Sequence, residues 1–210
     1  MNLPNALTVA RIAVTPLIAI LPFASSWVLR LVAFVLFTLA GLTDYVDGKL
    51  ARSRAEVTDL GKLLDPLADK LLLLGTLIPM YLLAPTWPFR TPFGDVGLPW
   101  WVLAIVLGRE AFMTLFRQAA ARRGVIIAAI GAAKWKTGFQ LVWQGSAYCW
   151  FFAAALAESR GWSNALWRDF ALFNGTVGTL MMTVAVVLTV YSFALYLRSF
   201  SSVFAASPTK

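Results

Sequence analysis

The chain has no histidine and only one cysteine, Cys149. Without histidine it lacks the commonest general base and the commonest ligand of transition metals, which leaves carboxylates to hold hard cations such as Mg²⁺ or Mn²⁺. A single cysteine cannot form an intramolecular disulfide, and it cannot build a cysteine-based zinc site. Any metal site in this protein is therefore expected to depend on its carboxylates.

Charged residues are also scarce, at 13% of the 210 residues, whereas hydrophobic residues make up 60% and the mean hydropathy is +0.74. Soluble domains carry about 25% charged residues. We therefore expect an all-α, polytopic membrane protein with six transmembrane helices, since a bilayer helix needs about 20 apolar residues. The apolar runs cover residues 5–24, 27–50, 61–84, 98–120, 135–157 and 170–198. The breaks are too short for a second domain, so residues 1–210 are expected to form a single integral-membrane domain.

Lysine and arginine are unevenly distributed over the breaks between the apolar runs. Eleven of them lie in residues 49–62, residues 117–136 and the C-terminal tail, whereas the other breaks hold four. The positive-inside rule then predicts a multi-pass protein of the cell (inner) membrane, with both termini and the active site on the cytoplasmic side. The net charge of +8 does not indicate nucleic-acid binding, because the basic residues flank apolar runs.

Four aspartates stand at helical spacing within this apolar chain. Asp44 and Asp47 share one helix face, and Asp65 and Asp69 share another. A carboxylate near the bilayer centre costs roughly 2.5 to 3.5 kcal/mol, so cationic partners are expected beside these acids. Two antiparallel helices joined by a short connection over residues 53–60 would aim all four carboxylates at one point. A pair of divalent cations about 3.5 to 4 Å apart would fit there.

Other interpretations of the aspartates remain open. They could form structural salt bridges with neighbouring lysines and arginines inside the membrane. They could also line a transport path for divalent cations, although such a path needs carboxylates at both membrane faces and these acids gather towards one. Against a purely structural role, Gly48, Ala51 and Gly61 are small where a ligand or a second helix must come close, and Arg52 is placed to meet a phosphate.

The string Asp44-x2-Asp47-Gly48-x2-Ala51-Arg52-x8-Gly61-x3-Asp65-x3-Asp69 resembles the full signature of the CDP-alcohol phosphatidyltransferase family. The resemblance implies a six-helix membrane fold, usually a homodimer, that transfers a phosphatidyl group from a CDP-linked lipid to an alcohol and releases CMP. It implies divalent metals, Mg²⁺ or Mn²⁺, held by Asp44, Asp47, Asp65 and Asp69. It also implies contacts with the CDP-lipid at Asp44, Gly48, Ala51, Arg52 and Gly61, and Asp69 as the catalytic base.

Basic residues outside this signature bear on the choice of alcohol. Arg109 lies inside the fourth apolar run, Arg117 follows about two turns later, and Lys134 and Lys136 open the fifth run. Such residues can form an anion pocket, which a phosphorylated alcohol needs and serine or free inositol does not. Arg109 needs a partner so deep in an apolar run, and its immediate neighbour Glu110 is expected to be a poor one. The alternative is that the other basic residues only fix topology and contact lipid headgroups.

More of the chain resembles one branch of that family, the bacterial phosphatidylglycerophosphate synthases. The resemblance rests on residues 2–11, on Arg109-Glu110-x6-Arg117, and on Gly131-Ala-Ala-Lys134-Trp-Lys136-Thr137. It implies CDP-diacylglycerol as donor and sn-glycerol 3-phosphate as acceptor. The acceptor phosphate would be held by Arg109, Arg117, Lys134 and Lys136, with Thr8 and Arg11 approaching from the first helix. Inositol phosphate, serine or a phospholipid remain alternative acceptors.

The last two apolar runs carry little further chemistry. Gly175 and Gly178 make a small-residue face, which is expected to pack against another helix or form a dimer contact.

Overall fold

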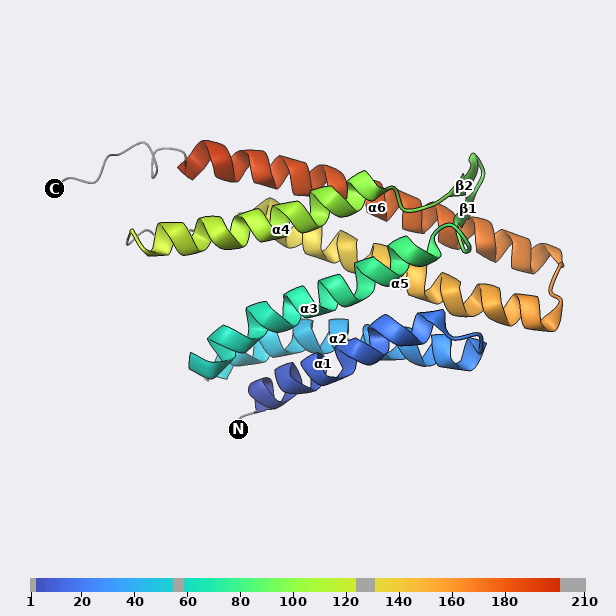
Figure 1. Ribbon diagram of the computed structural model, residues 1–210, viewed down its shortest axis with the longest axis horizontal. Helices are drawn as coiled ribbons and strands as arrows, with labels where there is room; N and C mark the ends of the chain where they lie inside the picture. Colours follow the sequence, from blue (N-terminus) through green and yellow to red (C-terminus); the bar gives the residue numbers. More distant parts are fainter. Residues whose placement is uncertain (1–2, 55–58, 124–130, 201–210) are drawn as a thin grey trace.

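The computed structural model describes the backbone of residues 3–54, 59–123 and 131–200, and the side chains of residues 5–43, 61, 64–123 and 135–198. Within these ranges the chain forms six long helices and one small β-hairpin (Figure 1). The helices are α1 (Leu3–Ile20), α2 (Trp27–Arg54), α3 (Asp59–Leu83), α4 (Trp100–Ala121), α5 (Gly131–Arg160) and α6 (Ala165–Phe200), with a 3₁₀ turn at Leu21–Phe23. The hairpin pairs β1 (Phe89–Thr91) with β2 (Gly94–Val96).

The six predicted helices are confirmed, and a small hairpin that was not predicted forms in the break between α3 and α4. Among the described residues, three helical segments are long and apolar enough to cross a membrane: Asn5–Phe23, Leu64–Leu83 and Ala165–Arg198. The apolar part of α2 described here, Trp27–Thr43, is shorter. In α4 and α5 the polar residues that build the site described below, such as Arg109 and Lys136, interrupt the apolar sequence.

The helices run lengthwise along the molecule and alternate in direction (Figure 1). The end of α2, the start of α3, the end of α4 and the start of α5 lie at the left-hand end of the view. The start of α1 and the end of α6 lie towards this same end. The turn between α1 and α2, the hairpin and the turn between α5 and α6 lie at the other end. The start of the first helix and the end of the last helix therefore share one end of the molecule, as six alternating helices require.

The core is closed by contacts among α1, α3 and α5. At Gly75 of α3 a Cβ atom would lie 2.8 Å from Cγ2 of Thr15, so the missing side chain lets α1 and α3 approach closely. The buried hydroxyl of Tyr148 on α5 donates to the carbonyl oxygens of Ile18 at 3.0 Å and of Gly75 at 3.2 Å. Its ring stacks on Phe37 of α2. One tyrosine thereby links four helices.

The hairpin lies directly on α6. A Cβ atom on Gly175 would overlap with the backbone of Arg90, and one on Gly178 would lie 2.6 Å from the ring of Phe89. These two glycines therefore pack against strand β1 of the same chain, whereas they were expected to contact another helix or a second copy of the chain. At the hairpin tip Gly94 has a φ of +116°, which favours glycine. Beside it, Phe93 is 99% exposed.

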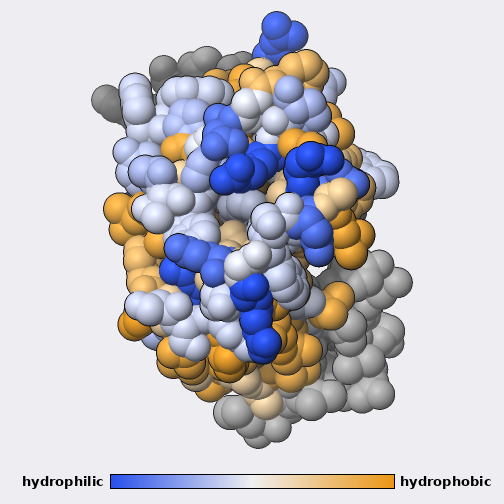
Figure 2. Space-filling model, turned by 90° about the vertical axis from the view of Figure 1, so that its right-hand side faces the viewer, coloured by the Kyte–Doolittle hydropathy of each residue, from blue (hydrophilic) through white to orange (hydrophobic). Residues whose placement is uncertain are grey.

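Tryptophans and charged residues gather at this same end of the molecule. Trp150 stacks on Trp167 with ring centroids 5.6 Å apart, and Nε1 of Trp150 donates to the carbonyl oxygen of Trp87 at 3.2 Å. The guanidinium of Arg30 lies over the Trp87 ring at 4.7 Å. Between the hairpin segment, the end of α5 and the start of α6 is a cavity of about 960 Å³. Figure 2 shows hydrophilic side chains on this end face and hydrophobic ones along its edges.

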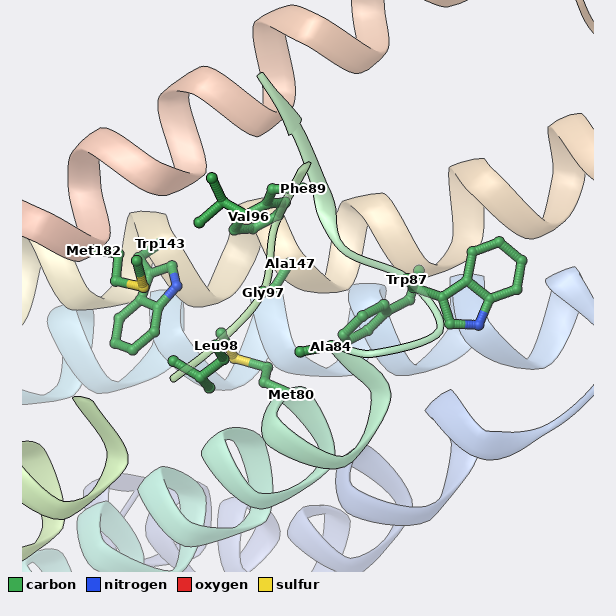
Figure 3. A pocket seen from close by; sticks show the side chains of 11 residues that line it. Met80, Ala84, Trp87, Phe89, Val96, Gly97, Leu98, Trp143, Ala147 and Met182 are labelled. Carbon is green, nitrogen blue, oxygen red and sulfur yellow. The ribbon is translucent and has the colours of Figure 1, made fainter. Parts of the chain in front are cut away.

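A second cavity lies beneath the hairpin, where α3, α5 and α6 meet it (Figure 3). Its volume is about 20 Å³, and its lining includes Met80, Phe89, Trp143 and Met182 and no charged side chain. It has room for about one water molecule and few polar groups to bind one. This cavity is therefore too small and too apolar for a catalytic site, and the signature residues lie at the other end of the molecule.

Candidate active site

The first half of the aspartate signature lies on the last turns of α2. Asp44, Asp47, Gly48, Ala51 and Arg52 belong to this helix, which continues to Arg54. The helix ends close to the expected connection at residues 53–60, and α3 begins at Asp59. The side chains of these residues lie outside the described part of the structure, so the convergence of all four carboxylates stays a prediction. Figure 1 places the end of α2 and the start of α3 at the same end of the molecule, as that prediction requires.

The second half of the signature lies on the first turns of α3. Asp65 and Asp69 are exposed one helical turn apart, and Gly61 is buried one turn earlier. The hydroxyl of Thr8 on α1 donates to Oδ1 of Asp65 at 2.8 Å. Nη1 of Arg11 lies 3.3 Å from Oδ1 of Asp69. The two acids are thus held at fixed positions by side chains of the first helix.

Helix α1 reaches these acids through a polar stripe. Asn5, Thr8, Arg11 and Thr15 follow one another at helical spacing, and all four are buried. We expected Thr8 and Arg11 to contact the phosphate of the acceptor, but the contacts described for them include Asp65 and Asp69. They support the aspartate site directly, and a contact with the acceptor stays a prediction.

The donor set suits a hard divalent cation, because carboxylate oxygens are the ligands that Mg²⁺ and Mn²⁺ prefer. Asp65 and Asp69 each have one oxygen fixed by a neighbour, which orients the carboxylate. Among the described residues no group of three metal-binding side chains occurs. The side chains of Asp44 and Asp47, which would complete the set, lie outside them. Metal binding by the four aspartates therefore stays a prediction.

A second charged cluster joins α4 and α5. Oε1 of Glu110 accepts a hydrogen bond from Nη1 of Arg109 at 2.8 Å, and it also contacts Nζ of Lys136. The side chains of Arg109 and Lys136 are 8% and 6% exposed. The expectation that Glu110 is a poor partner for Arg109 is wrong, since both side chains are long enough to meet where Lys136 approaches from α5. Two buried cations thus share one carboxylate oxygen.

Tyr196 on α6 completes this cluster and was not predicted. Its fully buried ring lies 5.9 Å from the guanidinium of Arg109 and 5.8 Å from that of Arg117. Nη2 of Arg117 lies 3.5 Å from its hydroxyl. A signal for it exists in the sequence, because Thr189, Ser192 and Tyr196 follow one another at helical spacing; in the structure all three are buried. Of the four basic residues that were predicted to bind the acceptor phosphate from α4 and α5, the structure joins Arg109, Arg117 and Lys136; the side chain of Lys134 lies outside the described residues.

The sequence matches the CDP-alcohol phosphatidyltransferase family over residues 1–191. The chain belongs to this family. Membership agrees with the helical architecture and with the apolar helices of a membrane protein. The matched residues include the whole signature on α2 and α3.

Relatives of this CDP-alcohol phosphatidyltransferase carry more specific names. A CDP-diacylglycerol–glycerol-3-phosphate 3-phosphatidyltransferase of Rickettsia bellii is 32% identical over 198 residues, which cover 94% of each chain. The Bacillus subtilis protein of the same name is 36% identical over 155 residues, covering 67% of this chain and 73% of its own. A probable phosphatidylglycerophosphate synthase of Mycobacterium tuberculosis is 39% identical over 144 residues. That alignment covers 67% of this chain but only 63% of the mycobacterial one.

Proposed function

We propose that the protein transfers the phosphatidyl group of CDP-diacylglycerol to sn-glycerol 3-phosphate, giving phosphatidylglycerol phosphate and CMP. The names of its relatives support this reaction, and so does the match to the family signature. The observation that carries the choice of acceptor is the buried cluster of Arg109 and Lys136 around a single carboxylate.

That cluster has an excess of positive charge. Arg109 and Lys136 contribute two cations and Glu110 one anion, with Arg117 nearby across Tyr196. Buried charges are stable only when they are paired, so the site calls for a further anion. The dianionic phosphate of glycerol 3-phosphate supplies one. Free inositol carries no anionic group, and the carboxylate of serine carries one negative charge where the phosphate carries two.

The reaction is a direct displacement at phosphorus. The acceptor hydroxyl oxygen forms a bond to the phosphorus that carries the diacylglycerol, while the bond from that phosphorus to the CMP oxygen breaks and its electron pair leaves with CMP. Asp69 accepts the hydroxyl proton, Arg52 and the small Gly48, Ala51 and Gly61 receive the cytidine diphosphate, and Thr8 and Arg11 hold Asp65 and Asp69 in place. A divalent cation, Mg²⁺ or Mn²⁺, held by Asp44, Asp47, Asp65 and Asp69 would neutralise charge that develops on the phosphate oxygens.

The site and both chain ends are proposed to lie on the cytoplasmic side of the cell membrane, with all six helices spanning the bilayer. The excess of lysine and arginine in residues 49–62 and 117–136 supports this orientation. Membrane lipids surround the exposed apolar faces of the helices, and a homodimer is proposed as the assembled form.

Release of CMP tests the proposal directly. Purified protein is incubated with CDP-diacylglycerol, Mg²⁺ or Mn²⁺, and in turn glycerol 3-phosphate, inositol phosphate, serine or glycerol. We expect CMP release with glycerol 3-phosphate, none after chelation of the divalent cation, and none from Asp69→Asn. Faster turnover with serine or inositol phosphate would contradict the acceptor assignment. Turnover that persists in strong chelator would contradict the metal-dependent mechanism.

A further inference from the structure

The large cavity at the hairpin end of the molecule lies far from the aspartates of the signature. Its volume of about 960 Å³ is at the upper end of the range of ligand-binding pockets. Figure 2 shows hydrophilic side chains over this end face. Four tryptophans contribute to the cavity wall: Trp87, Trp150, Trp162 and Trp167. Because tryptophans gather at the level of lipid headgroups, we expect the cavity to lie at the membrane surface.

The cavity wall carries charged side chains of both signs. The cations are Arg90 and Arg168, and the anions are Asp95 and Glu158. Arg90, Asp95 and Glu158 form no ion pair with another residue that the structure describes. Arg168 has only a long contact, in which its Nε atom lies 4.0 Å from Oδ1 of the exposed Asp169. A ligand with one positive and one negative group would pair with both kinds of side chain at once.

Two of these charges stand at helix ends where they are unfavourable. Glu158 lies in the last turn of α5, at the negative end of that helix dipole. Arg168 lies in the first turn of α6, at the positive end of its dipole. Neither charge therefore stabilises its own helix. A cation bound beside Glu158 and an anion bound beside Arg168 would offset both unfavourable contacts.

The stacking of two tryptophans narrows the cationic group of the ligand. Trp150 and Trp167 lie with their ring planes 4° apart and their centroids at 5.6 Å, so each ring covers one face of the other. A quaternary ammonium group is bound mainly by open aromatic faces. A primary ammonium group instead donates three hydrogen bonds, for which carboxylates are strong acceptors. Asp95 and Glu158 therefore favour a primary ammonium group.

An apolar turn beside the cavity indicates that the ligand is a lipid. Arg30 joins the two features, because its Nε atom donates to the carbonyl oxygen of Ala24 at 2.9 Å and its guanidinium lies 4.7 Å from the centre of the Trp87 ring. Ile20 and Phe23, in the turn before Ala24, are 65% and 47% exposed. Acyl chains can lie against this turn while a headgroup reaches the cavity. A water-soluble zwitterion would make no use of this apolar surface.

We propose that this cavity binds the headgroup of a zwitterionic phospholipid that carries a primary ammonium group, as phosphatidylethanolamine does. The phosphate of the lipid lies at Arg90 and Arg168. Its ammonium group lies at Asp95 and Glu158, and its acyl chains follow the turn between α1 and α2. The inference does not depend on the proposed reaction, because the cavity and the signature aspartates lie at opposite ends of the molecule.

Native mass spectrometry of the full-length, delipidated protein in detergent tests the proposal. The protein is titrated with dioleoyl phosphatidylethanolamine, with dioleoyl phosphatidylcholine, whose ammonium is trimethylated, and with the anionic dioleoyl phosphatidylglycerol. Each titration gives an apparent Kd. Arg168→Gln and Glu158→Gln each remove one charge from the cavity wall. Arg160→Gln is the matched control, because Arg160 is exposed at the end of α5 and does not line the cavity.

We expect the wild type to bind phosphatidylethanolamine about fivefold more tightly than phosphatidylcholine, because a trimethylated ammonium cannot donate hydrogen bonds to the carboxylates. Arg168→Gln and Glu158→Gln should each raise the Kd for phosphatidylethanolamine about fivefold, and Arg160→Gln should leave it unchanged. Phosphatidylglycerol has no cation for Glu158 to pair with, so its binding should not weaken in Glu158→Gln. A general attraction between the protein and lipid phosphates predicts the reverse for this variant, namely tighter binding of every lipid.

Two outcomes overturn the inference. One is an equal Kd of the wild type for phosphatidylethanolamine and phosphatidylcholine. The other is a Kd for phosphatidylethanolamine that is unchanged or lower in Glu158→Gln. The thermal midpoint of each variant verifies that it folds, and Arg90→Gln replaces Arg168→Gln if the latter does not. No measurement here depends on turnover, so failure of the proposed reaction would leave this test intact.

Discussion

At the scale of single residues, the first helix supplies the partners of the acids on α3. Thr8 and Arg11 are both 3% exposed and each contacts one aspartate of the signature. A carboxylate that is hydrogen-bonded on one oxygen has less freedom to rotate, so its other oxygen is held ready for a ligand. The two acids on α3 therefore depend on a second helix for their orientation.

The Thr8 hydroxyl gives a direct test of this dependence. Thr8→Val keeps the shape of the side chain but removes the donor to Asp65, a hydrogen bond to a charged group worth about 1.5 to 3 kcal/mol. We expect kcat/KM in the CMP-release assay to fall about tenfold or more. Thr8→Ser keeps the hydroxyl and should retain most of the activity. Equal activity of the valine and serine variants would show that the hydrogen bond does not matter for turnover.

The sequence predicted which residues share a helix face better than it predicted which side chains pair. Spacing alone put Asp65 with Asp69 on one face, and the structure agrees. The pairing of Arg109 with Glu110 was judged unfavourable because adjacent residues on a helix diverge. The sequence cannot show that a lysine from α5 draws both side chains to one point. Such pairings depend on how helices pack, which the helical period does not reveal.

At the scale of elements, the hairpin packs closely on α6 because two residues of that helix are glycines without a side chain. Gly175 lies against the backbone of Arg90 and Gly178 against the ring of Phe89. Backbone atoms cannot move aside as a flexible side chain can, so the contact at Gly175 is the stricter of the two. The hairpin in turn covers the small apolar cavity of Figure 3.

Gly175→Ala should loosen this contact. The added methyl group overlaps with the backbone of Arg90, and overpacking of this kind costs about 1 to 3 kcal/mol. We expect the thermal midpoint of unfolding in detergent to fall by about 5 °C. Gly108→Ala is the matched control, because a Cβ there meets nothing within 4 Å. A Gly175→Ala variant as stable as this control would contradict the close packing of the hairpin on α6.

Helix positions were predictable and the hairpin was not. Long apolar runs fix each helix to within a few residues, since length and composition act over many positions. The strands of the hairpin have three residues each, too few for an alternating pattern to stand out. The turn residues Pro92 and Gly94 were the available signal, and they indicated only a break between helices.

At the scale of the whole molecule, the two ends carry different residues. Asp65 and Asp69 lie near the end where α3 starts, and the tryptophan cluster lies at the end of the hairpin (Figure 1). Six helices were predicted from the apolar runs and are present in the described residues, whereas the crossing of a bilayer by all six stays a prediction. Which end faces the cytoplasm follows only from the positions of lysine and arginine, so it stays a prediction.

Chemical labelling can establish the orientation, because Cys149 is the chain's single cysteine. In a Cys149→Ala background, Asp95→Cys marks the hairpin end and Arg122→Cys marks the end of α4, both at exposed positions. In right-side-out membrane vesicles, a membrane-impermeant maleimide should label Asp95→Cys and spare Arg122→Cys. In inverted vesicles the pattern should reverse. The opposite result in each preparation would place the active site outside the cell.

The exposed tip of the hairpin offers a binding site for a marker in imaging. Even as the proposed homodimer, a chain of 23.0 kDa gives particles too small to align well in electron cryomicroscopy, so it needs a rigidly attached marker. Phe93 projects into solvent at 99% exposure, while the strand before it is fixed against α6 at Gly175 and Gly178. An antibody fragment raised against this tip would hold one orientation on the particle. It would also leave the aspartates at the other end open to substrate.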